Sequence, residues 1–285
     1  MMLIFLSTLR MSTPLLFAAI GGMFCERSGV INIALEGFML FGAFFAAAFT
    51  IATGNPWLGL AGALAGGAAF GLLYGLFVIQ WRINQVVAGT AFNFLAMGLI
   101  PFALKILYGS TGASPSIPIE QRFQIFPVFG AWGITAFAWF VLRYTPYGLW
   151  LSFAGENPEA LDAAGISVRG VRYSAVMIGS ALAAAGGASL SIFLSSGYAR
   201  NMSAGRGFMA LAALIFGKWR PIPAALACLF FAFMEALQIS AQNITELPIP
   251  AEFIQCLPYL ATMIALAGFV GSSKPPKQLG NAFPR

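Results

Sequence analysis

Long apolar stretches recur along almost the whole chain, and polar residues are confined to the short intervals between them. A helix needs about 20 mostly apolar residues to cross the hydrocarbon core of a membrane. Stretches of this kind lie at 5–24, 30–53, 57–81, 86–108, 125–142, 173–197, 206–219, 221–241 and 252–271. The first and the seventh are weaker, because each is short or is interrupted by Pro or Arg. The pattern predicts an all-α, polytopic transmembrane helix bundle with about eight or nine spans.

Two of these stretches carry a small residue at every fourth position, which places the small residues on one helix face. The first series is Gly59, Ala63, Gly67, Gly71 and Gly75, and the second is Gly179, Ala183, Gly187, Ser191 and Ser195. Small residues at this spacing let helix backbones approach closely inside a membrane. We expect tight packing within one subunit, and an interface between subunits is the alternative.

The composition excludes a water-soluble domain. Hydrophobic residues make up 59% of the chain and charged residues only 8%, whereas soluble domains contain about 25% charged residues. We therefore interpret residues 1–285 as a single transmembrane domain. The chain has no His, and its three Cys lie in or beside apolar stretches, so neither a metal site nor a structural disulfide is expected. The net charge of +6 comes from basic residues scattered singly, which does not indicate nucleic-acid binding.

The distribution of Lys and Arg predicts the orientation, because cytoplasmic loops are enriched in these residues. With the C-terminal tail 272–285 in the cytoplasm, the inner side holds Arg27, Arg82, Arg143, Arg169, Arg172, Lys218, Arg220, Lys274, Lys277 and Arg285. The outer side then keeps only Arg10, Lys105, Arg122, Arg200 and Arg206. This orientation places the N-terminus outside and makes 143–172 the longest cytoplasmic loop.

Two parts of the chain share an arrangement. In Thr13–Thr53, a short segment, the charged turn Glu26-Arg27 and a long helix follow one another. The same order recurs in Arg206–Ala241, with Lys218-Trp219-Arg220 as the turn. Both units cross in the same direction in the predicted topology, so we interpret them as related halves in a parallel repeat. Chance similarity is the alternative.

The cytoplasmic loop carries the signals of a short helix at 157–165. Asn157 is a favourable N-cap, and Pro158 suits the first helical position, where its missing N–H costs nothing. Glu159 in the first turn interacts favourably with the helix dipole, and Gly165 provides the stop. The pattern predicts about two turns of helix outside the membrane.

This helix is also where acidic residues concentrate. Three of the nine acidic residues in the chain lie here, namely Glu156, Glu159 and Asp162. In so weakly charged a chain, this concentration indicates a docking surface for a soluble partner. The alternative is a connector helix resting on the membrane, but such helices usually carry Lys and Arg on their polar face.

Several motifs resemble those of a known family. Gly155-Glu156-Asn157-Pro158-Glu159-Ala160, followed by Ala164-Gly165-Ile166, is similar to the coupling motif of bacterial ATP-binding-cassette (ABC) importer permeases. Glu26-Arg27-Ser28-Gly29-Val30-Ile31-Asn32-Ile33, Leu35-Glu36-Gly37 and Asn84-Gln85-Val86-Val87-Ala88-Gly89-Thr90 look like the nucleoside and simple-sugar members. The resemblance covers about residues 13–271. It is to the permeases for branched-chain amino acids, ribose and nucleosides, closest to the nucleoside and simple-sugar branch.

The resemblance implies a non-catalytic permease subunit of an ATP-driven importer for nucleosides or related simple sugars, in the bacterial inner membrane. The implied partners are an ATPase with two nucleotide-binding modules, a second and often paralogous permease subunit, and a substrate-binding lipoprotein or periplasmic protein. The ATPase would bind ATP and Mg²⁺, because this chain has no Gly-x4-Gly-Lys-Ser/Thr loop, and no cofactor is expected here. The implied coupling residues are Gly155, Glu156, Asn157, Pro158, Glu159, Ala160, Asp162, Ala164 and Gly165.

Polar residues inside the apolar stretches are candidates for a translocation path. They are Asn32, Glu36, Asn93, Glu235 and Gln238. A charged side chain at bilayer depth costs at least about 2.5 kcal/mol, so these residues are expected to face protein or water. The alternative is a structural role, either in interhelical hydrogen bonds or in an ion pair of Glu36 with Arg27 or Arg82. For Glu36 we favour the structural role.

Two other functions are compatible with part of the pattern. An ion-coupled secondary transporter would use Glu36 or Glu235 as its proton carrier, but a self-contained carrier needs no docking helix. An intramembrane enzyme would need a general base or a metal ligand set. With no His and with Asp162 as its sole Asp, in a loop, the chain offers neither.

Overall fold

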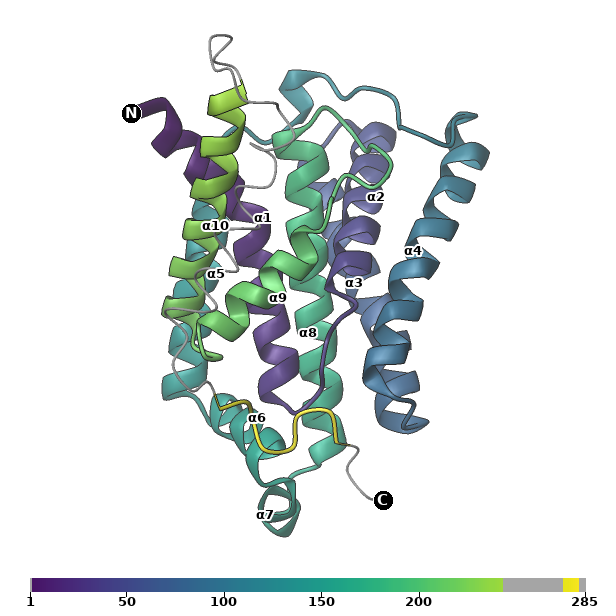
Figure 1. The fold of residues 1–285 in the computed structure, drawn as a ribbon. Coiled ribbons are helices and arrows are strands. Elements are labelled where there is room, and N and C mark those ends of the chain that lie inside the picture. Colours follow the sequence, from purple (N-terminus) through teal and green to yellow (C-terminus); the bar gives the residue numbers. More distant parts are fainter. Residues whose placement is uncertain (1, 243–273, 282–285) are drawn as a thin grey trace.

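The computed structural model describes residues 2–242 and 274–281, and in these ranges the chain forms a helical bundle (Figure 1). Seven of the described helices are long and apolar enough to cross a membrane. They are α1 Met2–Arg27, α2 Leu35–Thr53, α3 Pro56–Gly75, α4 Gln85–Tyr108, α5 Phe126–Tyr144, α8 Val168–Ser189 and α10 Pro221–Gln242. Two of them, α3 and α8, continue as the π-helical turns η1 Leu76–Gln80 and η3 Leu190–Leu194. The predicted all-α bundle is confirmed.

The shorter helices are η2 Ile119–Gln121, α6 Pro146–Glu156, α7 Pro158–Ala163 and α9 Arg206–Phe216. With 11 residues, α9 is about 16 Å long, roughly half the thickness of a hydrocarbon core. The weak span predicted at 206–219 therefore does not cross the bundle. The span predicted at 252–271 lies outside the described residues.

Several helices begin at polar residues that cap them. The side chains of Asn55, Asn84 and Asn157 accept hydrogen bonds from backbone N–H groups at the starts of α3, α4 and α7. Thr145 and Ser167 do the same for α6 and α8. Such caps satisfy N–H groups that have no partner within the helix. The helix starts are therefore set by local sequence.

The small-residue faces pack inside this chain, as predicted. The central helix α8 packs against α1, α2 and α3. A Cβ added to Gly67 of α3 would meet Ala184 and the Ser180 carbonyl of α8, and one added to Gly187 of α8 would collide with the Met39 backbone of α2. These contacts replace the hydrophobic effect as the source of helix association in lipid.

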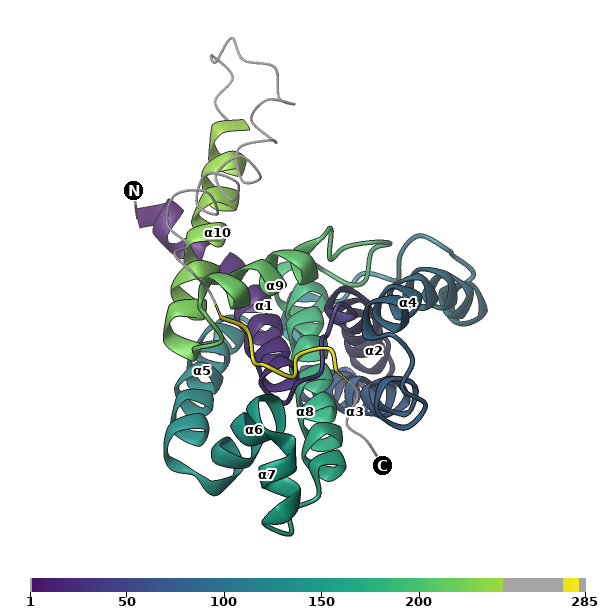
Figure 2. The same cartoon turned by 60° about the horizontal axis from the view of Figure 1, so that its bottom comes forward.

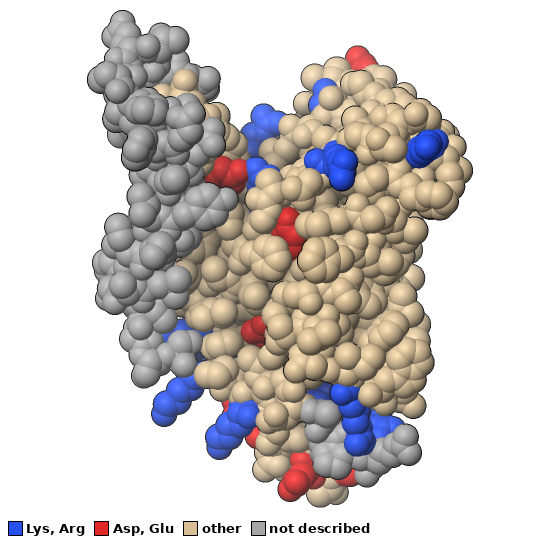
Figure 3. Space-filling view, turned by 45° about the vertical axis from the view of Figure 1, so that its right-hand side comes forward, with Lys and Arg blue, Asp and Glu red and all other residues tan. Residues whose placement is uncertain are grey.

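The two ends of the bundle differ in which chain segments lie there. The N-terminus lies at the end opposite α7, whereas residues 274–281 lie at the α7 end, beneath α1 and α8 (Figures 1 and 2). Basic side chains lie near both ends, and the broad belt between them shows few charged atoms (Figure 3). This distribution is typical of a multi-pass membrane protein.

The two proposed halves differ in the order of their shorter and longer helices. The first unit begins with a helix of 26 residues, α1, followed by the shorter α2 of 19 residues. The second begins with the 11-residue α9, followed by α10 of 22 residues. The predicted order of short segment and then long helix therefore holds only for the second unit, because the first helix runs on through Pro14. The relation between the halves stays a prediction.

Candidate functional site

The predicted docking helix forms at Pro158–Ala163. Asn157 Oδ1 accepts a hydrogen bond from the Ala160 N–H at 3.2 Å, and Pro158 takes the first position. The helix ends at Ala163, and the chain turns away at Gly165, whose φ of +77° suits glycine and whose N–H donates to the Asp162 carbonyl at 2.9 Å. The short helix predicted for 157–165 is thus present, one turn shorter than its predicted bounds.

The two faces of α7 differ. Glu159 and Asp162 are exposed, whereas Leu161 is buried in an apolar cluster with residues of α1, α8 and α9. The helices on which α7 itself packs are α6 and α8. The acidic face is therefore free to bind, and the apolar face is seated on the bundle.

A second short helix, α6, precedes α7 and was not predicted. Its sequence signal is the same as that of α7, because Thr145 caps it and Pro146 takes the first position. The Tyr147 hydroxyl lies 2.9 Å from the Ser174 hydroxyl of α8. Burial raises the pKa of Tyr147, which favours the neutral hydroxyl in this contact. Through α6, the docking helix is tied to α8.

Arg172 of α8 links four segments at the α7 end. Its guanidinium donates to the carbonyls of Ser28 at 3.1 Å, Ala154 at 3.3 Å and Asn281 at 3.0 Å. The sequence identified Arg172 only as an orientation signal. Its role here depends on residues from three distant parts of the chain, which no local pattern could reveal.

The segment 274–281 lies across this junction. The Gln278 N–H donates to the Gly155 carbonyl at 2.8 Å, and the Gly280 N–H donates to the Gly29 carbonyl at 3.0 Å. Gly155 belongs to α6 and Gly29 to the connection between α1 and α2. The C-terminal segment thus joins the docking region to that connection.

The connection between α1 and α2, residues 28–34, is not helical, although the sequence predicted a continuous span from residue 30. It returns from the α7 end into the bundle, so that α2 begins part-way along its neighbours (Figure 1). Irregular backbone at membrane depth needs protein partners, because no water is available there. The Tyr74 hydroxyl donates to the Ile31 carbonyl at 2.8 Å, and Gln85 Oε1 accepts the Ile31 N–H at 2.6 Å.

Two residues predicted for the translocation path also form hydrogen bonds at or beside the non-helical connection 28–34. Asn93 donates to the Ile33 carbonyl at 3.1 Å and accepts the Gly37 N–H at 2.8 Å. Asn32 is fully buried; its amide donates to Cys25 Sγ at 3.2 Å, and its Oδ1 has no partner among the described residues. Asn93 of α4 therefore contacts the connection and the first turn of α2, and Asn32 lies within the connection.

Glu36 joins α2 to the start of α9. One carboxylate oxygen accepts from the Ser203 hydroxyl at 2.6 Å and the Gly205 N–H at 2.8 Å, and the other accepts from the Gly207 N–H at 2.7 Å. A carboxylate at a helix N-terminus interacts favourably with the helix dipole. The ion pair with Arg27 or Arg82 is wrong; Glu36 instead forms interhelical hydrogen bonds, the other form of the structural role.

Glu235 and Gln238 approach the same place from α10. Glu235 forms an ion pair with Arg206, the first residue of α9, and its second carboxylate oxygen has no partner among the described residues. Gln238 lies three positions further along α10 and is half-buried. The start of α9 thus brings together Glu36 and Glu235, the acidic residues of the two predicted polar stripes.

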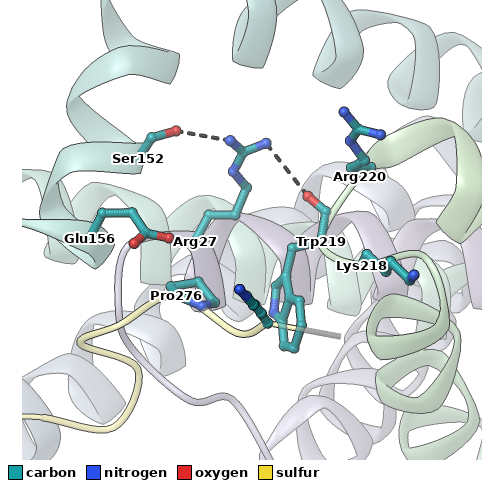
Figure 4. Close-up of a pocket in the computed structure, with 8 residues that line it drawn as sticks. Arg27, Ser152, Glu156, Lys218, Trp219, Arg220 and Pro276 are labelled. Carbon is teal, nitrogen blue, oxygen red and sulfur yellow. Dashed lines mark hydrogen bonds between the residues drawn. The ribbon is translucent and has the colours of Figure 1, made fainter. Parts of the chain in front are cut away.

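The turn between α9 and α10 rests on the end of α1. Lys218 and Trp219 both adopt positive φ, which is unfavourable for non-glycine residues. Trp219 Nε1 donates to Glu26 Oε2 at 2.6 Å, and Arg27 donates to the Trp219 carbonyl at 3.5 Å (Figure 4). The two charged turns of the proposed halves therefore contact each other.

The fold is that of a polytopic membrane protein whose interior contains the non-helical connection 28–34 and the short helix α9, and which exposes the acidic face of α7 at one end. The family model described as "Branched-chain amino acid transport system / permease component" matches residues 4–269. The chain belongs to this permease family, which confirms the resemblance inferred from its motifs.

Three relatives illustrate the family. A guanosine ABC transporter permease protein of Bacillus subtilis is 37% identical, covering 96% of this chain and 94% of the relative. A nucleoside ABC transporter permease protein of Lactococcus lactis is also 37% identical, covering 94% of this chain and 92% of the relative. A putative glucose ABC transporter permease protein of Haloferax volcanii is 33% identical, covering 84% and 78%.

Proposed function

We propose that this chain is the permease subunit of an ATP-driven importer for nucleosides. The support is that relatives named for guanosine and nucleoside transport match it along nearly the full length of both chains. Family membership also disfavours the ion-coupled carrier. The substrate moves by alternating access, in which rigid-body motions expose a central path first to one side and then to the other.

The partners follow from the family and from the surface. An ABC ATPase with two nucleotide-binding modules binds the acidic face of α7 and supplies the ATP and Mg²⁺ sites. A second permease subunit, which we expect to be a paralogue, completes the path, and a lipoprotein or periplasmic protein delivers the substrate. The α7 end, with segment 274–281, is then the cytoplasmic side of a bacterial inner membrane.

The contacts around α7 suggest how closure of the ATPase reaches the path. Leu161 lies in the buried apolar cluster at this end and α7 packs on α6 and α8, while Arg172 ties α6 and α8 to the 28–34 connection. That connection leads directly into α2 and Glu36, which holds the start of α9. A push on α7 would therefore act, through α6 and α8, on the 28–34 connection and on the start of α9.

We place the path beside the start of α9. Glu235 retains a carboxylate oxygen without a partner among the described residues, and Gln238 is half-buried nearby; both are suited to hydrogen-bond the hydroxyl groups of a solute. Asn32, Glu36 and Asn93 are buried and support the path indirectly, because they hold the 28–34 connection and the starts of α2 and α9 in place. Discontinuous helices at mid-depth are a common site of substrate binding in transporters.

The observation that carries the proposal is the near full-length match to nucleoside permeases in a chain that presents a capped acidic helix. Its test is uptake by the complete transporter reconstituted in liposomes with labelled guanosine. We expect accumulation that requires ATP on the α7 side and is competed by other nucleosides but not by glucose. Competition by glucose alone would contradict the substrate, and accumulation without ATP would contradict the mechanism.

A further inference from the structure

Basic side chains surround a hollow at the α7 end. The cavity has a volume of about 210 Å³ and is lined by Arg27, Lys218, Arg220 and Lys274, with Glu156 as the one acidic residue in its lining (Figure 4). Arg27 donates to Ser152 at 2.9 Å and to the Trp219 carbonyl at 3.5 Å, both of which are uncharged groups. These contacts orient the guanidinium without neutralising it.

A second hollow adjoins the first, and the two share Arg27 and Arg220. It has a volume of about 460 Å³ and adds Arg143 to the basic lining, but it is otherwise apolar, with Trp139 and Ile222 among its walls. Its apolar walls come from α5 and α10, two membrane-spanning helices. The combined site is therefore basic at one end and apolar at the other.

None of these five cations has a carboxylate within salt-bridge distance in the part of the chain that the structure describes, where Arg206–Glu235 is the ion pair found. Like charges gathered around a hollow repel one another, and an anion placed between them removes that repulsion. The general enrichment of Lys and Arg in cytoplasmic loops explains basic residues that occur singly at the ends of membrane helices. It does not explain five around two hollows that share Arg27 and Arg220.

We propose that the combined site binds an anionic phospholipid, with the phosphate between Arg27 and Arg220 and the acyl chains along the groove between α5 and α10. Basic pockets between membrane helices on the cytoplasmic side are suited to such head groups. Exposed Trp139, 37% accessible, provides the aromatic contact typical of the membrane interface. Trp139 and Ile222 belong to spanning helices, so acyl chains suit the apolar end as the phosphate suits the basic end.

The test is native mass spectrometry of the intact transporter with added phosphatidylglycerol or phosphatidylcholine. We expect retention of phosphatidylglycerol, and the double variant R143Q/R220Q should weaken it about tenfold or more. R143K/R220K, which keeps both charges, should restore binding. Both arginines are exposed, so neither variant is expected to unfold the bundle. R82Q, an exposed cation at the same end but outside the hollow, is the matched control.

The outcomes are distinguishable. Loss of phosphatidylglycerol in R143Q/R220Q but not in R82Q, with weaker acyl-chain retention in W139A, supports the proposal. Equal loss in R143Q/R220Q and R82Q overturns it, as does displacement of the lipid by inorganic phosphate at low concentration, which would indicate a plain anion site. If R143Q/R220Q keeps the lipid but loses the ATPase, the surface belongs to the protein partner and the proposal fails. Lipid binding is measured directly, so this result is independent of the transport assay.

Discussion

The interior junction of α2 and α9 and the hollow at the α7 end use polar residues in opposite ways. At the junction, Glu36 and Asn93 direct their hydrogen bonds mainly to backbone groups. At the hollow, Arg143 and Arg220 line a cavity without a carboxylate beside them among the described residues. The side chains at the junction hold helices together by satisfying backbone groups. The side chains at the hollow leave a charged surface to which a ligand can bind.

Solvent explains the difference. Inside the bundle, backbone freed by a helix break has no water to bond, so a polar side chain there first satisfies the backbone. At the membrane surface, water and lipid head groups can pair with a charge, so the cations need no protein partner. The role of a polar residue in a membrane protein therefore depends on the groups to which its atoms bond. The depth of the residue in the membrane does not determine that role by itself.

The largest expected effect is at Glu36. Replacement by Leu removes three hydrogen bonds and leaves the buried Gly207 N–H and the partly buried Gly205 N–H without this partner, which should lower the free energy of unfolding by at least about 3 kcal/mol. Glu36→Gln keeps the shape and part of the bonding and should be milder. Thermal unfolding of the purified transporter measures both. If E36L is as stable as the wild type, the junction is not held by this carboxylate.

Overpacking of the small-residue faces comes next. Gly67→Leu must push α3 away from α8, which should destabilise by about 1–3 kcal/mol or more. Gly98 of α4 has open space around its Cβ position, so Gly98→Leu is the matched control and should be nearly neutral. Equal thermal shifts in the two variants would mean that helix contact within the subunit is not what Gly67 provides.

Arg172→Met should have a smaller effect on stability and a larger one on the C-terminal segment. Loss of the donors to Ser28, Ala154 and Asn281 is expected to cost about 1–3 kcal/mol and to release residues 274–281. Limited proteolysis followed by mass mapping reports cleavage near Lys277. Arg172→Lys cannot reach three carbonyls and should be cleaved almost as fast; protection equal to the wild type would argue against the link.

The smallest effect on stability is expected at the hollow. R143Q/R220Q should change the free energy of unfolding by no more than about 0.5 kcal/mol, because both side chains are exposed and Arg143 contacts only the ring of its neighbour Tyr144. A destabilisation as large as that of E36L, in the same thermal assay, would remove the contrast between the two regions.

Features that depend on neighbouring residues in the chain could be predicted from the sequence. The spans follow from apolar length, and α7 follows from Asn157, Pro158 and Gly165. The start of α6 carried the same kind of signal in Thr145-Pro146 and could have been found. The break at residues 28–34 was missed because Val30, Ile31 and Ile33 are as apolar as the helix that follows.

The remaining features depend on contacts between distant residues. Glu36 lies 167 positions from Ser203, and Arg172 lies 144 positions from Ser28. Both are charged residues beside apolar stretches, a pattern that is equally compatible with a path, an ion pair or a backbone contact. Only the packing of the helices decides between these roles.

The most direct test of the account concerns α7 as the docking site of the ATPase. A photo-crosslinking residue placed at Glu159 in the assembled transporter should capture the ATPase, and capture should depend on the nucleotide state. The same residue at Glu120, an exposed acidic position in η2 at the opposite end, should not capture it. Crosslinking of the ATPase from position 120, or its absence from position 159 in a transporter that still imports, would contradict the account.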